Sequence, residues 1–303
     1  MKRMILLPLT ALLISSAAFG QQVPDTIYSP AIENPAYAPG KGPVVFIDEG
    51  HNNFHTRGDR YLPFTRLLER DGYVTEGYSG PFEAGKLSRC RILVISNALN
   101  AANVTAWYKP VLPAFTQEET EAVRRWVEAG GSLFLIADHM PMGGAAAGMA
   151  AAFGFGFTDG FAGDTARSGP ALFCRAEGTL ADNIMTNGHN AAERVDSIYS
   201  FTGQAFTIPP DASPVLTFDD RHLLLLSDTA WVFDSSTVFK HITGWSQLAF
   251  MDYGRGRVVM GGEAAMFTAQ LAGPQQARAG MNSPFAKRNY KLLLNIIHWL
   301  DRR

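Results

Sequence analysis

The chain of 303 residues is 47% hydrophobic and 18% charged, which is ordinary for a globular protein. Its length allows one large α/β domain or two small ones. The formal net charge of −2 argues against nucleic acid or an anionic membrane surface as the main partner.

The N-terminus has the three parts of a secretory signal peptide. Lys2 and Arg3 precede a short apolar run, and small residues follow it up to Gly20. The apolar run is too short to span a bilayer, and no later segment is long and apolar enough. We therefore expect residues 1–20 to be removed by cleavage between Gly20 and Gln21, which gives a periplasmic or secreted protein without a membrane span. The alternative is a retained N-terminal anchor.

The next segments predict an extended lead-in and the first half of a sheet. Residues 21–42 are rich in Pro, Gly, Ala and Tyr without periodicity, as in an extended segment. Short apolar runs at 43–48, 73–78 and 91–99 are typical of buried parallel strands. Between the first two runs, apolar residues at helical spacing predict a helix that ends at Gly72.

A second helix is predicted from Thr116, which forms a capping box with Glu119. A strand over 132–139 and a helix of small residues over 143–154 follow it. This alternation of strands and helices predicts a parallel sheet covered by helices on both faces.

The remainder of the chain predicts irregular structure followed by a hairpin and a helix. Residues 155–215 are rich in Gly, Pro and Asp and predict long loops with short elements. Two apolar runs around 254–256 predict a β-hairpin, and 289–303 predict an amphipathic helix. We expect residues 43–303 to form a single domain.

The two cysteines have no clear chemical role in the sequence. Cys90 and Cys174 could pair in an oxidising compartment or remain free thiols. Their spacing in the sequence does not distinguish a disulfide from two free thiols. Neither has a neighbouring His that would indicate a nucleophile.

Polar side chains gather where the expected strands end. In an open parallel sheet the ligand binds outside the carboxyl ends of the strands. Three segments that are far apart in the sequence bring acidic or imidazole groups to that edge, and a fourth brings amides. In chain order these candidates are Asp48, Glu49, His51, His55, Asn97, Asn100, Asp138, His139 and Glu263. Their joint placement predicts a functional pocket.

Each candidate also has a purely structural interpretation. An Asp at a strand end can cap the helix that follows, and His139 can bond a backbone carbonyl. His51 and His55 share a face only if their loop is helical, which the asparagines between them argue against. Glu263 can be the acidic partner of a helix N-terminus.

Two segments resemble a known superfamily. Residues 122–154, "AVRRWVEAGGSLFLIADHMPMGGAAAGMAAAFG", resemble the strand–elbow–helix segment of class I glutamine amidotransferase-like proteins. Residues 253–267, "YGRGRVVMGGEAAMF", are similar to the "GxGRV" hairpin of the ThuA-like branch and related uncharacterised exported proteins. The resemblance places Asp138 or His139 at the elbow, and Glu263 where that hairpin returns a His or an acidic residue.

The resemblance implies an α/β fold, namely a flavodoxin-like three-layer sandwich with a mostly parallel central sheet and a C-terminal β-hairpin plus helix. The elbow lacks the nucleophilic Cys of the catalytic amidotransferases. Glutamine hydrolysis through a thioester is therefore not expected. The resemblance covers most of residues 43–301 by element order and is specific only at the two segments quoted.

One chemical interpretation of this edge is a metal site. Neutral imidazoles and carboxylates are the ligands of Zn²⁺ or a similar divalent cation with an open position for water. His51, His55 and Asp48 are the metal candidates, with Glu263 as a general acid or base.

The other interpretation needs no metal. His139 or His51 abstracts a proton, Asp138 orients the imidazole, and Glu263 donates a proton. We take Asp138, His139 and Glu263 as the catalytic candidates under either interpretation. Loop residues lack the fixed spacing that would decide between the two.

The candidate substrate-binding residues are Asn52, Asn97 and Trp107, and Trp107 with Phe54 could form an apolar platform for a sugar. We predict an exported, Cys-independent hydrolase or lyase that acts on a small carbohydrate-like substrate. The carbohydrate preference rests on the ThuA-like analogy alone. The alternative is a non-catalytic module that binds a glycan or a protein at the same polar edge.

Overall fold

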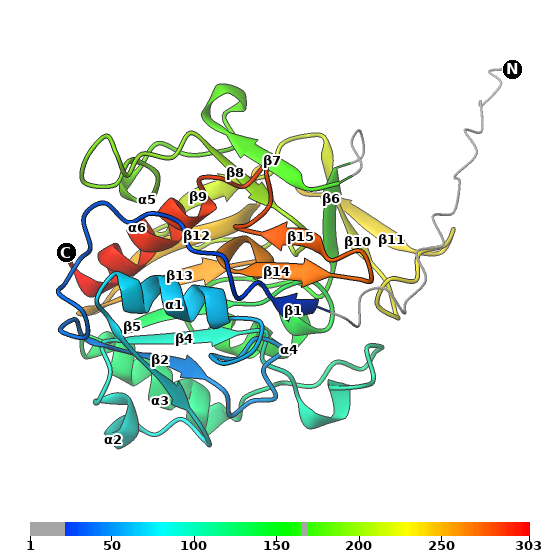
Figure 1. Cartoon of the computed structure of the whole chain (residues 1–303). Helices are drawn as coiled ribbons and strands as arrows, with labels where there is room; N and C mark the ends of the chain where they lie inside the picture. The colour runs from blue at the N-terminus through cyan, green and yellow to red at the C-terminus, as the bar shows by residue number, and fades with distance from the viewer. Residues whose placement is uncertain (1–21, 165–168) are drawn as a thin grey trace, which may run out of the picture.

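The structure, a computed structural model, describes residues 22–164 and 169–303. The expected signal peptide, residues 1–20, lies outside these ranges. A seven-stranded sheet forms the centre of the molecule (Figure 1). From one edge to the other its strands are β3 (Val74–Tyr78), β2 (Val44–Asp48), β4 (Ile92–Ser96), β5 (Ser132–Ile136), β13 (Gly256–Gly261), β12 (Ser246–Tyr253) and β9 (Ser213–Thr217).

The central sheet is mixed, and this corrects the expectation of a mostly parallel sheet. The strands from β3 to β13 pair in parallel, whereas β12 pairs antiparallel with both β13 and β9. The reason is local, because the tight turn at Gly254–Arg255 sends the chain straight back along its own strand. The predicted hairpin is confirmed, and it is the element that makes the sheet mixed.

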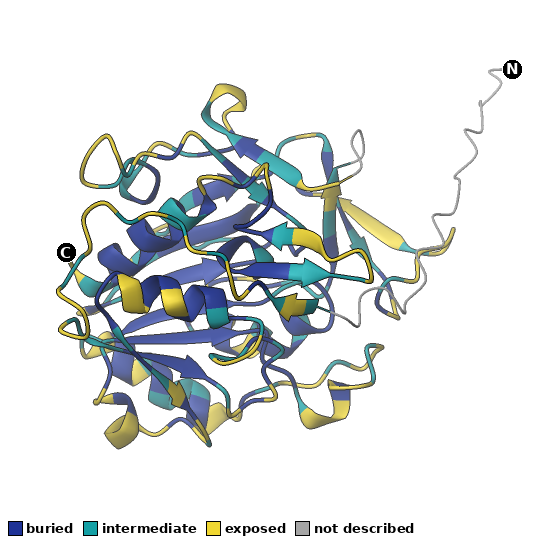
Figure 2. Ribbon diagram, viewed as in Figure 1, coloured by how far each residue is buried: buried dark blue, intermediate teal, exposed yellow. Residues whose placement is uncertain are grey.

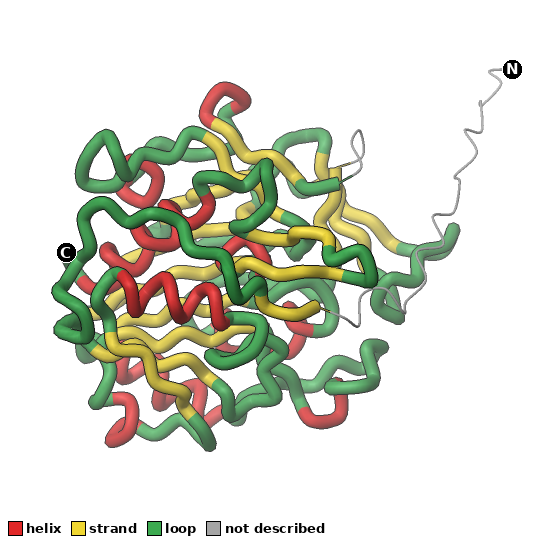
Figure 3. Tube along the Cα trace, in the orientation of Figure 1, coloured by secondary structure: helices red, strands yellow, loops and turns green. Residues whose placement is uncertain are grey.

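Three smaller sheets contain the remaining strands of the described residues. One joins β6 (Phe161–Asp164), β10 (His222–Leu226) and β11 (Val238–His241), and a second joins β7 (Ala171–Cys174) and β8 (Ser197–Ser200). The third joins β1 (Gln22–Pro24), β14 (Ala269–Ala272) and β15 (Ala277–Gly280). The α/β class is therefore confirmed in its broad form. The flavodoxin-like sandwich is not established, because the middle of the chain forms small sheets and loops (Figure 3).

Helices are few among the described residues. They are α1 (Leu62–Arg70), α2 (Ala84–Leu87), α3 (Gln117–Glu128), α4 (Met142–Ala151), α5 (Ile184–Asn187) and α6 (Asn289–Asp301), with short 3-10 turns η1 (Ala101–Asn103), η2 (Arg175–Glu177) and η3 (Ala265–Phe267). No helix of this part of the chain has the length and apolar character needed to cross a bilayer. Cys90 and Cys174 are both free thiols, so they do not form a disulfide.

The sheet separates two hydrophobic cores. Successive residues of β2 point to opposite faces, so Val45 and Ile47 pack in one core and Phe46 packs in the other. The first core includes side chains of α1 and α6, and the second includes side chains of α3 and α4. Helices therefore cover both faces, as the strand and helix alternation predicts, and the central strands are almost wholly buried (Figure 2).

Close packing of α3 on the hairpin depends on a glycine in β13. A Cβ atom at Gly256 would collide with the backbone oxygens of Val127 and Gly131. We expect Gly256→Ala to lower the free energy of unfolding by about 1–3 kcal/mol, because backbone atoms cannot move aside as a flexible side chain can. Thermal unfolding measures this loss. Gly85→Ala is the control, since nothing lies within 4 Å of that Cβ position, and an equal loss in both variants would contradict the packing described.

Candidate functional site

The carboxyl ends of four neighbouring strands carry the polar residues expected from the sequence. Asp48 ends β2, Asn97 follows β4, and Asp138 and Glu263 come shortly after β5 and β13. Hydrogen bonds join three of these ends, because Asp138 accepts from both Asn97 and the backbone N–H of Ala264. The convergence predicted from strand order is therefore present for β4, β5 and β13.

Asp138 lies at the centre of this convergence and is partly exposed. Its Oδ2 accepts from Asn97 Nδ2 at 2.8 Å, and its Oδ1 accepts from Ala264 N at 2.9 Å. Asn97 Oδ1 in turn accepts from the backbone N–H of Asp138 at 2.8 Å. Asn97 has a φ of +50°, a conformation that is uncommon for a residue other than glycine. Burial raises the pKa of Asp138 to about 7, although the hydrogen bonds from Asn97 and Ala264 oppose this shift.

Glu263 is a buried carboxyl beside Asp138. It is 1% exposed, and its two oxygens each accept a backbone N–H at 2.7 Å, from Ala265 and Met266 in η3. Burial and the nearby charge of Asp138 raise the pKa of Glu263 well above its usual value. Because two neighbouring carboxyls with little access to solvent do not both ionise readily, the two residues titrate as a pair. Glu263 also has the structural role that the sequence allowed for it, since it caps the turn that follows.

His55 contacts this cluster through Asn97 and is 2% exposed. Its Nδ1 lies 3.2 Å from Asn97 Nδ2, and its Nε2 lies 3.3 Å from Gln270 Nε2. Burial lowers the pKa of His55 to about 3, so its imidazole is neutral at physiological pH. We refer to His55, Asn97, Asp138 and Glu263 as the Asp138 cluster.

His51 belongs to a separate ion cluster. Its Nδ1 lies 2.9 Å from Asp48 Oδ1, and its Nε2 lies 2.9 Å from Glu119 Oε1. Burial alone would lower the pKa of His51, but the hydrogen bonds and charges of the two carboxylates outweigh it and raise that pKa. With a carboxylate on each ring nitrogen, His51 is an imidazolium that holds the start of α3 against the end of β2.

The predicted metal ligands are not assembled into a site. Both ring nitrogens of His51 bond carboxylates, so neither has a lone pair for a cation, and the nitrogens of His55 face amide groups instead of Asp48. Within residues 22–164 and 169–303, no group of three or more His, Cys, Asp and Glu side chains could hold a metal ion. The residues present therefore do not fit the zinc site expected from the sequence.

His139 follows Asp138 in the chain but lies among aromatic rings. Its Nδ1 donates to Met140 O at 2.7 Å, which is the structural interpretation that the sequence allowed. Burial lowers the pKa of His139 to about 4, so Nε2 carries a lone pair at neutral pH. The ring stacks on Phe161 at 4.5 Å between centroids, and Trp231 and Trp107 lie 4.6 and 6.3 Å away.

A cavity of about 210 Å³ opens beside His139, and we call it the aromatic cavity. Phe161 and Trp231 line it and also contact the His139 ring. Phe201, which lies near the Glu263 carboxyl through its backbone, lines it as well. Gln247 lines the cavity at 2% exposure, and its Oε1 accepts no hydrogen bond. The cavity therefore combines aromatic walls with polar lining residues, among them Asp164, Ser200 and Thr202.

The three predicted substrate-binding residues have different positions. The Trp107 ring lies 5.9 Å from the Phe54 ring in an edge-to-face arrangement and 6.3 Å from the His139 ring, and an aromatic platform for a sugar stays a prediction. Asn97 is buried within the Asp138 cluster. Asn52 is exposed and donates to Leu99 O, and it makes no hydrogen bond to that cluster.

Sequence reasoning missed several partners of these residues. Glu119 was identified only as a helix cap, yet the same carboxyl bonds both Thr116 and His51. Gln270 and the aromatic cavity come from segments without a periodic pattern. The one signal in the sequence for the aromatic cavity is the group of aromatic residues in a Gly-rich region. Such a group is common in loops, so it has low specificity for a binding site.

Comparisons with known proteins show the fold and no more. No family model and no curated protein matches the chain. Among solved structures, the mmIFT52 N-terminal domain aligns over 85% of this chain and 96% of its own, with 12% identity and a TM-score of 0.58. The cytoplasmic protein STM1381 from Salmonella typhimurium LT2 aligns over 85% and 98%, with 12% identity and a TM-score of 0.50.

A more distant similarity concerns the branch named from the sequence. A putative ThuA-like protein from Bacteroides uniformis aligns over 90% of this chain and 95% of its own, with 14% identity and a TM-score of 0.45. This likeness is too distant to assign a family, and the ThuA-like resemblance stays a prediction. The class established by the fold is a mixed α/β protein.

Proposed function

We propose that this protein is an exported hydrolase or lyase that uses acid–base chemistry, with the Asp138 carboxyl as the group that exchanges a proton with the substrate. The observation that carries the proposal is the partly exposed Asp138 carboxyl, held by two hydrogen bonds beside buried Glu263, with a pKa raised to about 7. A carboxyl that titrates near neutral pH is suited to general acid–base catalysis. This acid–base chemistry requires no metal ion.

The neighbouring groups support defined roles in this proposal. Asn97 positions the carboxyl, and burial raises its pKa. The charge of Asp138 and burial together raise the pKa of Glu263, so Glu263 stays protonated beside it. His139 is neutral, so its Nε2 can accept a hydrogen bond from a substrate hydroxyl. The aromatic cavity offers apolar faces and polar lining residues such as Asp164 and Thr202, which together suit a small polyhydroxylated ligand such as a sugar.

The proposal predicts a dependence of activity on pH. If Asp138 acts as a base, kcat/KM rises as the carboxyl loses its proton and levels off above pH of about 7. Measuring kcat/KM between pH 5 and 9 (roughly the span over which such a group titrates) tests whether kcat/KM rises in this way. A profile that is flat through this range would show that the Asp138 carboxyl does not control the reaction.

A screen of chromogenic glycosides and esters with the mature protein tests for turnover.

The second candidate function is a binding module without catalysis. It is favoured by the internal hydrogen bonds of His51, His55 and Glu263, which engage the polar groups of these side chains within the protein. Saturable sugar binding by calorimetry, unchanged in Asp138→Asn and without turnover of any substrate, would establish the module.

A further inference from the structure

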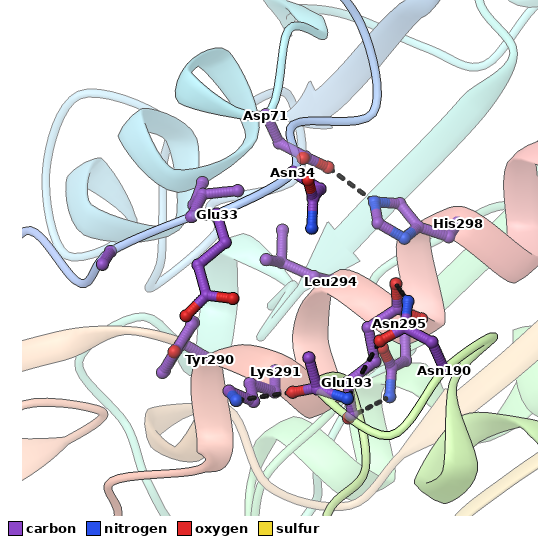
Figure 4. A pocket seen from close by; sticks show the side chains of 13 residues that line it. Glu33, Asn34, Asp71, Asn190, Glu193, Tyr290, Lys291, Leu294, Asn295 and His298 are labelled. Carbon is purple, nitrogen blue, oxygen red and sulfur yellow. Dashed lines mark hydrogen bonds and ion pairs between the residues drawn. The ribbon is translucent and has the colours of Figure 1, made fainter.

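His55 differs from the other buried histidines in the groups that its ring faces. Those other histidines each have an oxygen acceptor at a ring nitrogen, and they are His51, His139, His222 and His298. Figure 4 shows this for His298, whose Nε2 lies 2.6 Å from Asp71 Oδ2. The ring nitrogens of His55 instead face amide nitrogens, that of Asn97 at 3.2 Å and that of Gln270 at 3.3 Å. An amide nitrogen only donates, so in this arrangement the N–H of His55 has no acceptor.

The His55 ring is neutral, so it has one N–H and one lone pair. Burial and the charge of nearby Arg60 lower its pKa to about 3. The rings of Tyr61 and Phe54 enclose it, with centroids 4.7 and 5.4 Å from its own. A neutral imidazole donates at one nitrogen and accepts at the other. Two facing donors cannot both be satisfied, so one of the two amides has to present its oxygen.

Asn97 cannot be the amide that turns. Its Oδ1 accepts from Asp138 N at 2.8 Å, and its Nδ2 donates to Asp138 Oδ2 at 2.8 Å. Turning this amide would place two donors face to face and two acceptors face to face. The second hydrogen of Asn97 Nδ2 is therefore left for His55 Nδ1, which accepts it. The proton of the His55 ring is then on Nε2, the nitrogen that faces Gln270.

Gln270 is free to turn its amide. The residue is 1% exposed, and its Oε1 has no hydrogen-bond partner. Within the described residues, its side chain makes no hydrogen bond apart from the contact with His55. A half-turn about the last side-chain bond exchanges Oε1 and Nε2, and the hydrogen-bond partners decide which orientation is adopted. With Oε1 towards the ring, the His55 N–H is paired, whereas the opposite orientation leaves it buried and unpaired.

We propose that Gln270 is a positioning residue for Asp138. It acts through a chain of hydrogen bonds in which Gln270 Oε1 accepts from His55 Nε2–H and His55 Nδ1 accepts from Asn97 Nδ2. Asn97 Nδ2 in turn donates to Asp138 Oδ2. The backbone of Gln270 is held in place, because β14 is the middle strand between β1 and β15. This inference rests on the acid–base role proposed for Asp138.

The position of the proton on His55 tests this chain of hydrogen bonds without any substrate. In the mature protein with isotope-labelled histidine, long-range proton–nitrogen NMR correlations at neutral pH distinguish a ring nitrogen that carries a proton from one that carries a lone pair. We expect a proton on His55 Nε2 and a lone pair on Nδ1. A proton on Nδ1, or on both nitrogens, would overturn the proposal, since a Gln270 oxygen accepts only from Nε2–H.

Gln270→Met tests the effect on Asp138, because it removes the amide and keeps a side chain of similar length. The His55 Nε2–H then has no acceptor, so we expect the ring to populate both tautomers and the Asn97 amide to lose its partner at Nδ1. Burial raises the pKa of Asp138 and the hydrogen bond from Asn97 lowers it. Loosening that bond is expected to raise the titration midpoint of the Asp138 carboxyl by about half to one pH unit, the scale of one hydrogen bond. Carbon NMR of the carboxyl measures this midpoint.

The control is Gln275→Met, which makes the same change on the exposed turn between β14 and β15 and is expected to alter neither measurement. An unchanged His55 tautomer and an unchanged Asp138 midpoint in folded Gln270→Met would overturn the positioning role. If Gln270→Met does not fold, the wild-type tautomer alone decides. Neither measurement depends on turnover. Failure of the substrate screen would therefore count against the acid–base function alone, and a wrong tautomer would count against the role of Gln270 alone.

Discussion

Asp138→Asn is expected to lower kcat/KM by about a hundred- to ten-thousandfold, the range that general acid–base groups contribute. The substitution keeps the size of the side chain and one acceptor for Ala264 N, but it removes the group that exchanges a proton. It also turns an amide nitrogen towards Asn97 Nδ2, which costs one hydrogen bond of about 1 kcal/mol. The fold therefore survives while the chemistry is lost.

Steady-state kinetics on the best substrate of the screen measure this effect, with thermal unfolding as a check on folding. Asp252→Asn is the matched control, because Asp252 pairs with Arg257 on the hairpin far from the Asp138 cluster. The proposal predicts that the pH dependence near 7 disappears in whatever activity Asp138→Asn retains. Wild-type kcat/KM in a correctly folded Asp138→Asn protein would remove Asp138 from the reaction.

His51→Leu is expected to lower the free energy of unfolding by about 3–5 kcal/mol, the usual cost of removing one partner from a buried ion pair. The substitution leaves two carboxylates, Asp48 at 0% and Glu119 at 8% exposure, without their shared cation. For a chain of this size the loss corresponds to a fall in Tm of about 10 °C. His241→Leu, on the exposed strand β11, is the control and is expected to change Tm little.

The pH dependence of this difference distinguishes an ion cluster from simple packing. The pKa of His51 is raised in the folded protein, so its stabilising contribution is fully present below its unfolded pKa and is lost as pH rises through the folded pKa. The gap in stability between wild type and His51→Leu should therefore narrow from pH 6 to alkaline pH (about two units above the ordinary His pKa). A gap independent of pH would mean that His51 acts only by filling space between Phe82 and Phe115.

The strands of the parallel part of the sheet could be predicted because each is a continuous apolar run that ends in polar residues. β2, β4 and β5 are buried on both faces, so hydrophobicity alone marks them. The Thr116 capping box marks the start of α3 for an equally local reason. Convergence of Asn97 and Asp138 then follows from strand order.

The remaining features depend on contacts between distant residues that leave no local pattern. β9 joins the sheet through β12, and nothing in its own sequence specifies that partner. Glu119 reaches His51 across 68 positions, and Gln270 reaches His55 across 215. The arrangement of the two histidines has the same cause, because Glu119 on His51 and the amides of Asn97 and Gln270 on His55 come from distant parts of the chain.

The hydrogen bond between Asp138 and Ala264 N has a consequence for how the protein is made. The two residues are 126 positions apart, and β13, which carries Ala264 into place, pairs alongside β5. During synthesis, the elbow after β5 emerges long before the segment that supplies its backbone donor. In a nascent chain the edge of β5 is therefore unpaired, and Asp138 lacks its backbone donor, until about nine-tenths of the chain has left the ribosome. Docking of the hairpin then pairs the β5 edge and supplies the Ala264 N–H at the same time.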